Sequence, residues 1–325
     1  MNETATIQTN TKPTKWVESI FKKNRIKLLE SPKTIYEQPG GLVQLLTTDC
    51  GVYFLKGGAP SSVYEPAVTQ WLANHFPNQS VSVLAIEPEQ GWLLMADGGQ
   101  TLRQSFKTQP DLNSWKKVLA DHGRLQLETA DYTQDLLDFG TPDHRLVHLP
   151  NLYTNLLADS GWLLIDQENG VTVAEYDQLV GAITSIKEIC TELTNFGIPE
   201  SIHHNDLHDG NIFLNAGHLR YFDWGDCAVA HPFFVCRTAF VSIKGRFRLE
   251  EDDPVFKELG IDYTKTWQRY ASAENLLGAF RLARKLWSIS TALKYKSYLG
   301  QSAALRKKRK GVLPAIMKEF LDENR

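Results

Sequence analysis

The first hundred residues contain short runs in which apolar and polar positions alternate, a pattern typical of β-strands buried on one face. The runs at 34–38, 42–48 and 52–56 are rich in β-branched, aromatic and other apolar residues. Pro39-Gly40-Gly41 separates the first two runs, and Asp49-Cys50-Gly51 separates the second from the third. Both are turn sequences at hairpin spacing, so the pattern predicts a meander of three antiparallel strands.

A second pattern, with apolar residues every three or four positions, predicts helices on either side of this meander. One helix is expected at 15–23 and the other at 63–76. Two more strands are expected at 81–88 and 91–97. The order βββαββ therefore predicts a small α+β lobe over residues 15–97.

The rest of the chain, 98–325, has mostly helical spacing. Helices are expected at 114–129, 149–159, 172–196, 267–295 and 312–323. The polar stretch 1–14 has no apolar periodicity and is interpreted as a flexible tail. The fold class predicted for the chain is thus α+β and bilobal, with a small antiparallel-sheet lobe followed by a larger, mainly helical lobe.

Composition narrows the classes of function. The chain has 325 residues, 42% hydrophobic and 22% charged, and a formal net charge of −3, without the basic excess of a nucleic-acid binder. The basic run 306–310 is interpreted as a solvated helix face or turn, and the alternative is a patch that binds nucleic acid or an anionic surface. No apolar run reaches the ~18 residues of a membrane span, so no membrane partner is expected. The four cysteines lack metal-type spacing, which favours reduced thiols and a cytoplasmic location.

The stretch 201–215, SIHHNDLHDGNIFLN, concentrates three histidines, two aspartates and three asparagines. Residues 212–214 and 219–222 are predicted to form two strands. If these strands pair, the loop before the first and the residue after the second lie at the same end. That arrangement brings Asp206, Asn211 and Asp223 together, and their hard oxygen donors suit Mg²⁺.

A triphosphate bound to this Mg²⁺ would present its γ-phosphoryl group near Asp206. A site for phosphoryl transfer also needs a cation for the phosphates, and the small lobe offers one. Lys56 ends the predicted strand 52–56, and Glu65 lies at the start of the following helix, where it can position the ammonium. Backbone groups around Met95 and Ala96, where the lobe ends, are expected to face the purine of ATP.

Two motifs resemble the aminoglycoside phosphotransferase and choline kinase-like branch of the protein-kinase-like fold. HNDLHDGN (204–211) is similar to the catalytic loop of that family, commonly HGDLHPGN, and YFDWGD (221–226) is similar to its metal-binding segment. The order of Lys56, Glu65, the HxDxxxxN motif and Asp223 matches the family over roughly residues 30–325. No GxGxxG loop precedes Lys56, although members of this family often lack one.

The resemblance implies a role for each matching residue. Asp206 would orient or deprotonate the acceptor, and Asn211 and Asp223 would bind Mg²⁺. Lys56 would contact the nucleotide phosphates, held by Glu65. The two histidines of the loop complete the set: His204 would brace the loop, and His208 would either face the reacting groups or hydrogen-bond within the loop.

The expected function is that of a small-molecule kinase using ATP and Mg²⁺. Its acceptor would be a hydroxyl of a small, possibly cationic molecule such as an aminoglycoside, an amino sugar or choline. The alternatives are a kinase-like protein that binds nucleotide without catalysis, and a metal-dependent hydrolase with zinc on His204 and His208, which are spaced four residues apart as on a helix.

Overall fold

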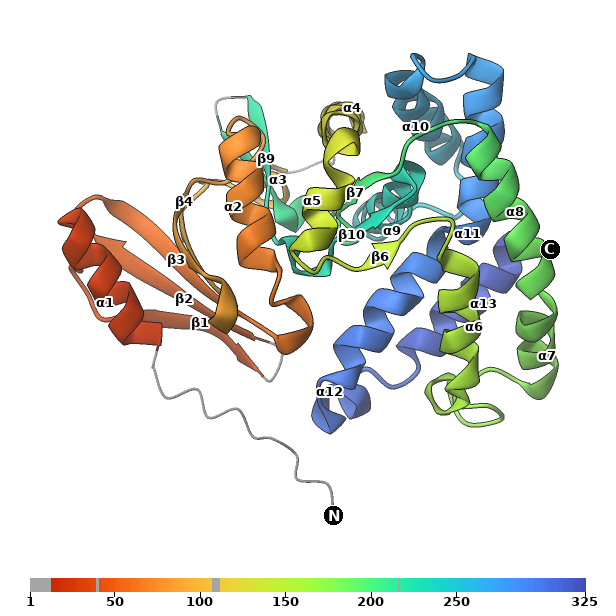
Figure 1. The fold of residues 1–325 in the computed structure, drawn as a ribbon, viewed down its shortest axis with the longest axis horizontal. Helices are drawn as coiled ribbons and strands as arrows, with labels where there is room; N and C mark the ends of the chain where they lie inside the picture. Colours follow the sequence, from red (N-terminus) through yellow and green to blue (C-terminus); the bar gives the residue numbers. More distant parts are fainter. Residues whose placement is uncertain (1–12, 39–40, 107–111, 216) are drawn as a thin grey trace.

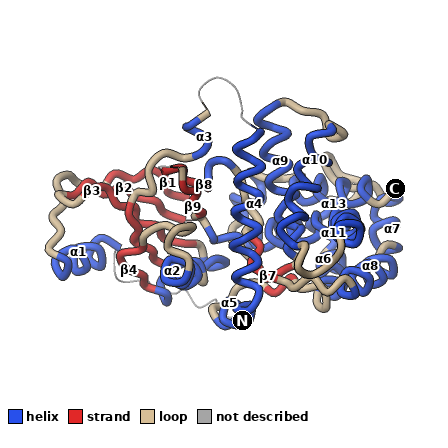
Figure 2. The backbone as a smooth tube through the Cα atoms, turned by 90° about the horizontal axis from the view of Figure 1, so that it is seen from above, coloured by secondary structure: helices blue, strands red, loops and turns tan. Residues whose placement is uncertain are grey.

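The protein, seen in a computed structural model, is described over residues 13–38, 41–106, 112–215 and 217–325. Most of the predicted tail, and Pro39 and Gly40 of the first predicted turn, lie outside these residues. The chain forms two lobes, with the sheet in one and most of the helices in the other (Figure 1). Figure 2, at right angles to the first view, shows the same separation of strands and helices.

The sheet of the small lobe has five strands in the order β1-β2-β3-β5-β4, all antiparallel to their neighbours. The strands are β1 (Lys33–Gln38), β2 (Gly41–Thr48), β3 (Gly51–Gly58), β4 (Val83–Glu87) and β5 (Trp92–Ala96). All five were predicted, and each lies within two residues of its expected place.

The two faces of this sheet meet different partners, because successive side chains of a strand point to opposite sides. On one face, Leu55 and Leu94 are buried with Val17 and Phe21 of α1 (Pro13–Asn24). On the other face, Met95 is buried near Leu93 and Phe213, and Phe213 belongs to the second lobe. The helix α2 (Glu65–His75) contacts the sheet through β4 and β5, while its own apolar side chains join the core of the second lobe.

The larger lobe is mainly helical. Its helices are α3 (Leu102–Ser105), α4 (Leu112–Thr129), α5 (Thr133–Asp138), α6 (Leu149–Ala158), α7 (Val173–Gly181), α8 (Ile183–Asn195), α9 (Val235–Phe247), α10 (Pro254–Thr264), α11 (Ala273–Gly300), α12 (Ala303–Lys308) and α13 (Val312–Glu323). Over the described parts of the chain, no helix combines the length and the apolar character needed to span a bilayer.

Two helix predictions were wrong in detail. The expected helix 172–196 is interrupted at Ala182, directly after Gly181, whose backbone freedom makes a helix interior less stable. The expected helix 267–295 begins only at Ala273, because the Ser272 side chain caps it by accepting a hydrogen bond from the Asn275 N–H. Neither α9 nor α10 was predicted.

Two small sheets lie within the helical lobe. One has the order β6-β10-β7, from β6 (Asp143–His144), β7 (Ser201–His203) and β10 (Ala228–Ala230), and the other pairs β8 (Ile212–Asn215) with β9 (His218–Tyr221). The pairing of β8 with β9 was predicted, and that of β7 with β10 was not. Together these two sheets hold the polar loops that the sequence singled out.

Candidate active site

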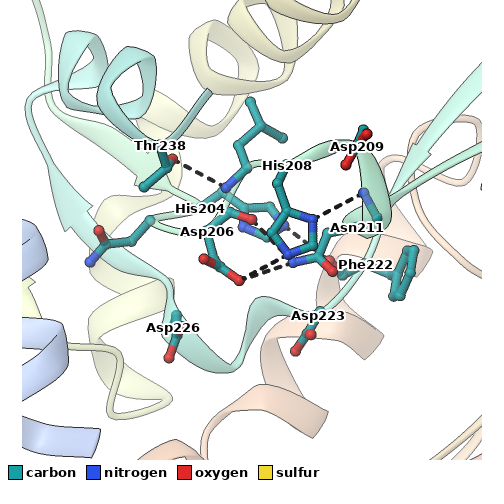
Figure 3. A network of polar contacts seen from close by, with 12 residues as sticks. His204, Asp206, His208, Asp209, Asn211, Phe222, Asp223, Asp226 and Thr238 are labelled. Carbon is teal, nitrogen blue, oxygen red and sulfur yellow. Dashed lines mark hydrogen bonds and ion pairs between the residues drawn. The ribbon is translucent and has the colours of Figure 1, made fainter. Parts of the chain in front are cut away.

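Two loops form the candidate site, and strand pairing fixes both ends of each. The first runs from β7 to β8 and carries Asp206 and Asn211, and the second runs from β9 to β10 and carries Asp223. At one end of the loops, β7 and β10 are antiparallel neighbours, and at the other, β8 and β9 are. The side chains of Asp206, Asn211, Asp223 and Asp226 consequently gather around one space, as predicted for the first three (Figure 3).

Asn211 is oriented by Asp206. Its amide nitrogen donates to the Asp206 carbonyl oxygen at 3.1 Å and to the carboxylate at 3.2 Å. The amide oxygen is therefore turned away from Asp206, where it can act as a ligand. Asp223 adopts a left-handed conformation with φ 66°, sparsely populated for a non-glycine residue, and its side chain is 44% exposed.

This donor set fits magnesium. Mg²⁺ is bound in proteins by one or two carboxylates or other oxygen ligands, with phosphates and water completing the octahedron. Asn211 and Asp223 offer such oxygens on facing loops. Within the described residues, no group of three or more His, Cys, Asp or Glu is arranged to hold a metal by itself, so phosphate and water oxygens would supply the remaining ligands.

Lys56 joins the small lobe to this site. Its ammonium lies 2.6 Å from Glu65 Oε1 and also forms an ion pair with the Asp223 carboxylate. Burial by itself lowers the pKa of Lys56, but Asp223 and Glu65 outweigh that effect and raise it above its ordinary value. The lysine therefore carries its charge at neutral pH.

Glu65 is brought to Lys56 by the start of α2, which is anchored on the second loop. The Tyr64 hydroxyl donates to the Gly225 carbonyl oxygen at 2.8 Å. A Cβ at Gly225 would lie 3.0 Å from Glu65 Oε2, so this close approach favours a glycine. The Glu65 side chain is only 2% exposed, and burial raises its pKa while Lys56 opposes that shift.

The sequence analysis missed Lys294 of α11. Its ammonium lies 3.2 Å from Asp206 Oδ1 and 3.4 Å from Asp226 Oδ2, and it donates to the Asn205 carbonyl oxygen at 2.8 Å. Burial opposes a charged lysine, but Asp226 and Asp206 raise the pKa of Lys294 to about 12. In turn, burial favours a raised pKa for Asp206, and Lys294 holds it below the ordinary value instead.

A signal for Lys294 existed in the sequence. Ser290, Thr291 and Lys294 follow one another on the inward side of α11, and all three are buried. Polar residues at helical spacing on an otherwise apolar face are buried at a cost unless they find partners. Here the side-chain partners are His144 for Ser290, Asn205 for Thr291, and the Asp206 and Asp226 carboxylates for Lys294.

The two histidines of the first loop point in different directions. His204 Nε2 lies 3.0 Å from the Phe222 carbonyl oxygen and so connects the two loops. His208 Nδ1 accepts a hydrogen bond from the Gly210 N–H at 3.0 Å, while its Nε2 lies 3.5 Å from Asp206 Oδ2. The rings do not converge on one point, and the zinc alternative gains no support from them.

Met95 and Ala96 are the last two residues of β5, which lies between β3 and β4 in the sheet. Met95 is buried between the lobes, and the Ala96 N–H already donates to the Ser82 carbonyl oxygen at 2.9 Å. The Asp97 N–H likewise donates to the Val52 carbonyl oxygen at 2.9 Å. A purine edge here would be met by carbonyl oxygens or by the N–H groups that follow Asp97.

The architecture is shared with small-molecule kinases. The chain is similar to the structure of the Plasmodium vivax ethanolamine kinase, with a TM-score of 0.61 and 12% identity over 97% of this chain and 89% of that one. It is similar to macrolide 2′-phosphotransferase type I, with a TM-score of 0.55 and 13% identity over 96% and 99% of the two chains.

A third similar structure is LicA in complex with AMP, with a TM-score of 0.56 and 13% identity over 95% and 98% of the two chains. LicA is a choline kinase from Streptococcus pneumoniae. No model of a protein family matches the chain, and neither does any curated protein sequence. At these identities the comparisons show the fold, and they confirm the bilobal, kinase-like architecture that the sequence predicted.

Proposed function

We propose that the protein is a Mg²⁺-dependent kinase that transfers the γ-phosphoryl group of ATP to a hydroxyl of a small-molecule acceptor. The observation that carries the proposal is the meeting of Lys56, held by a buried glutamate, with Asp223 and the facing pair Asp206 and Asn211. A cation and three oxygen-bearing side chains around one space are the parts that phosphoryl transfer requires. The similar structures, which are phosphotransferases acting on ethanolamine, macrolides and choline, support the same chemistry.

The nucleotide would bind between the lobes, with residues 15–97 as the nucleotide-binding lobe and residues 98–325 as the catalytic lobe. Lys56 would bind the phosphates, and Asn211 and Asp223 would hold Mg²⁺. The bound metal would draw negative charge from the phosphate oxygens. The four free cysteines, three of them buried, and the need for ATP favour a cytoplasmic site of action.

Asp206 would receive the acceptor. The acceptor oxygen forms a bond to the γ-phosphorus as the bond from that phosphorus to the ADP oxygen breaks, and the hydroxyl proton passes toward the Asp206 carboxylate. Asp206 is suited to this role because Lys294 and Asn211 hold its carboxylate from two sides. Lys294 keeps the Asp206 carboxylate ionised, and the Asp206 side chain remains 34% exposed for an incoming ligand.

The test compares Asp206→Asn with the wild type in two assays, ATP binding by calorimetry and ADP release with a panel of alcohol acceptors. Loss of a general base lowers the rate by about 10²- to 10⁴-fold, and ATP affinity should stay unchanged because Asp206 lies on the acceptor side. Asp131→Asn, at an exposed position, is the matched control.

Two outcomes would contradict the proposal. Undiminished ADP release in Asp206→Asn would remove Asp206 from the reaction. Mg²⁺-dependent ATP binding by the wild type without turnover of any acceptor would instead indicate a nucleotide-binding protein without catalysis.

A further inference from the structure

A cavity of about 440 Å³ lies on the acceptor side of Asp206. It is bounded by the first loop, by α9 and by α11, and its wall includes Asp206, His208 and Lys294. Three larger hollows, of about 750, 730 and 620 Å³, do not include Asp206. A molecule bound in the smaller cavity would therefore lie against the candidate catalytic carboxylate, and the charges of this cavity bear on the choice of acceptor.

The cavity is lined by more cationic than acidic side chains. The cationic ones are Arg103, Arg237, Arg246 and Lys294, and the acidic ones are Asp206 and Asp209. Two of the cations are already neutralised. Arg237 forms a two-point ion pair with Glu319, and Lys294 lies between Asp206 and Asp226, so that this second group carries one net negative charge at the Asp206 end of the cavity.

The other two cations, Arg103 and Arg246, share a single buried carboxylate. Arg103 Nε lies 2.8 Å from Asp209 Oδ1, and Arg246 Nε lies 3.7 Å from Asp209 Oδ2. Asp209 is only 2% exposed, and its Oδ2 atom has no hydrogen-bond partner. One carboxylate cannot neutralise two guanidinium groups, so the trio carries one net positive charge.

The two guanidinium groups are both oriented and accessible. Arg246 also donates to the Arg103 carbonyl oxygen at 3.3 Å, which ties the two residues together. Their side chains are nevertheless 51% and 39% exposed at the cavity, for Arg103 and Arg246 respectively. Paired guanidinium groups held by a buried carboxylate form a preorganised site for a planar or tetrahedral anion.

We propose that the acceptor carries an anionic group, a carboxylate or a phosphate, which binds Arg103 and Arg246 while its hydroxyl lies at Asp206. The proposal rests on the proposed kinase function, because only that function makes the molecule bound in this cavity an acceptor. It reverses the expectation of a cationic acceptor for the part of the cavity beside Arg103 and Arg246, because a cation bound there would face the excess positive charge of the two arginines. Asp209 occupies the position of the proline in the common HGDLHPGN loop of the family that this chain resembles, so the arginine pair depends on a residue that the common loop lacks.

The test uses four sugars with a common ring that differ in charge: glucose, glucosamine, glucuronate and glucose 6-phosphate. Binding is measured by calorimetry with Mg²⁺ and a non-hydrolysable ATP analogue present, and inorganic phosphate serves as a minimal anion. Glucuronate or glucose 6-phosphate should bind about tenfold more tightly than glucose, and glucosamine more weakly than glucose. The relative affinity of glucuronate and glucose 6-phosphate distinguishes a carboxylate from a phosphate as the preferred group.

Arg246→Gln is the principal variant, because it leaves the pair of Arg103 with Asp209 in place. It should lower the affinity for the anions by about tenfold and leave that for glucose unchanged. Arg103→Gln should have the same effect if it folds, which its melting temperature will show. Arg248→Gln, an exposed arginine beside α9 that does not line the cavity, is the matched control.

The proposal is overturned if glucosamine binds as tightly as glucuronate, if no anion binds, or if anion affinity is the same in Arg246→Gln. Failure of the kinase function would appear separately, as absent ATP binding or turnover. Arg246-dependent binding of inorganic phosphate can still be measured in that case, because it does not require the nucleotide.

Discussion

Lys56 and Asp223 are 167 residues apart in the sequence, and their side chains form an ion pair between the sheet lobe and the helical lobe. Lys56 lies on β3, and Asp223 follows β9. Glu65 binds the same ammonium, so three charges form one network in which Glu65 is buried and Asp223 is partly exposed. A network of this kind is stabilising when all its members are present and costly when one is missing.

The first prediction concerns this network. Lys56→Met should lower phosphoryl transfer by about 10²- to 10³-fold, because an electrostatic contact to the phosphates is lost. It should also lower the free energy of unfolding by roughly 3–5 kcal/mol, because Glu65 is left buried without its partner. Rates and urea denaturation measure the two effects.

A double variant separates the two effects. Lys56→Met combined with Glu65→Gln removes the unpartnered charge, so stability should return while activity stays low. If the double variant is as unstable as Lys56→Met, the uncompensated carboxylate is not the cause of the lost stability.

The second prediction concerns metal. Chelation with EDTA should abolish transfer, and Asp223→Asn should raise the Mg²⁺ concentration needed for half-maximal ATP binding by at least about tenfold. In the proposed site Asp223 would supply one of the two protein oxygens that bind the ion, and the neutral amide of the Asn variant would bind Mg²⁺ less tightly than the carboxylate does. Calorimetric titration of ATP at several Mg²⁺ concentrations measures this without relying on turnover. ATP binding and transfer that persist in EDTA would contradict it.

The third prediction concerns Lys294. Lys294→Met should lower kcat by about ten- to hundredfold and leave the KM for ATP unchanged, because the Asp206 carboxylate loses the group that positions it. A purely structural role would lower stability without this split between kcat and KM. Adding Asp226→Asn removes one of the two carboxylates that share Lys294 and should recover much of the stability. Steady-state kinetics with thermal melting checks both parts, and an unchanged kcat would show that Asp206 does not depend on Lys294.

The fourth prediction concerns the pH dependence of stability. Burial lowers the pKa of His122 and His231 to about 3 and that of His144 to about 4, from an ordinary value of 6.5. Below pH 6.5 the unfolded chain binds protons that these folded sites do not, so stability is complete above that pH and falls as the pH drops toward 4. Each histidine contributes a slope of about 1.4 kcal/mol per pH unit.

Urea denaturation at a series of pH values measures this slope. His144→Gln can retain a hydrogen bond to the Ser290 hydroxyl, which lies 2.8 Å from His144 Nδ1, and should reduce the slope by the share of one histidine. Stability that is constant from pH 6.5 to about 4.5 would show that these rings are protonated in the folded protein.

Local patterns were sufficient for the sheet and for most of the longer helices, but not for α9 and α10 or for the short helices α3, α5 and α12. In α10, Gly260 resembles a turn signal in the sequence. The structure shows another reason for it, since a Cβ at Gly260 would lie 2.8 Å from the Phe280 ring of α11. In α9, Arg237 and Lys244 interrupt the apolar stripe, and Arg237 is buried only because Glu319 of α13 pairs with it. Gly260 and Arg237 are both explained by contacts with helices that are distant in the sequence. A local pattern of apolar and polar residues carries no information about such contacts.

The sequence by itself determined the order of the candidate site residues Lys56, Asp206, Asn211 and Asp223 and the hairpin that brings the last three together. It could do so because strand alternation and turn residues are local, and a hairpin places its two ends side by side. The tertiary structure alone decided the surroundings of Asp206. Lys294 pairs with Asp206, and Arg103 and Arg246 pair with Asp209 of the same loop, from helices whose directions depend on packing across the whole lobe. Under the proposal made above, those residues would set the charge at the acceptor and with it the kind of molecule that the protein accepts.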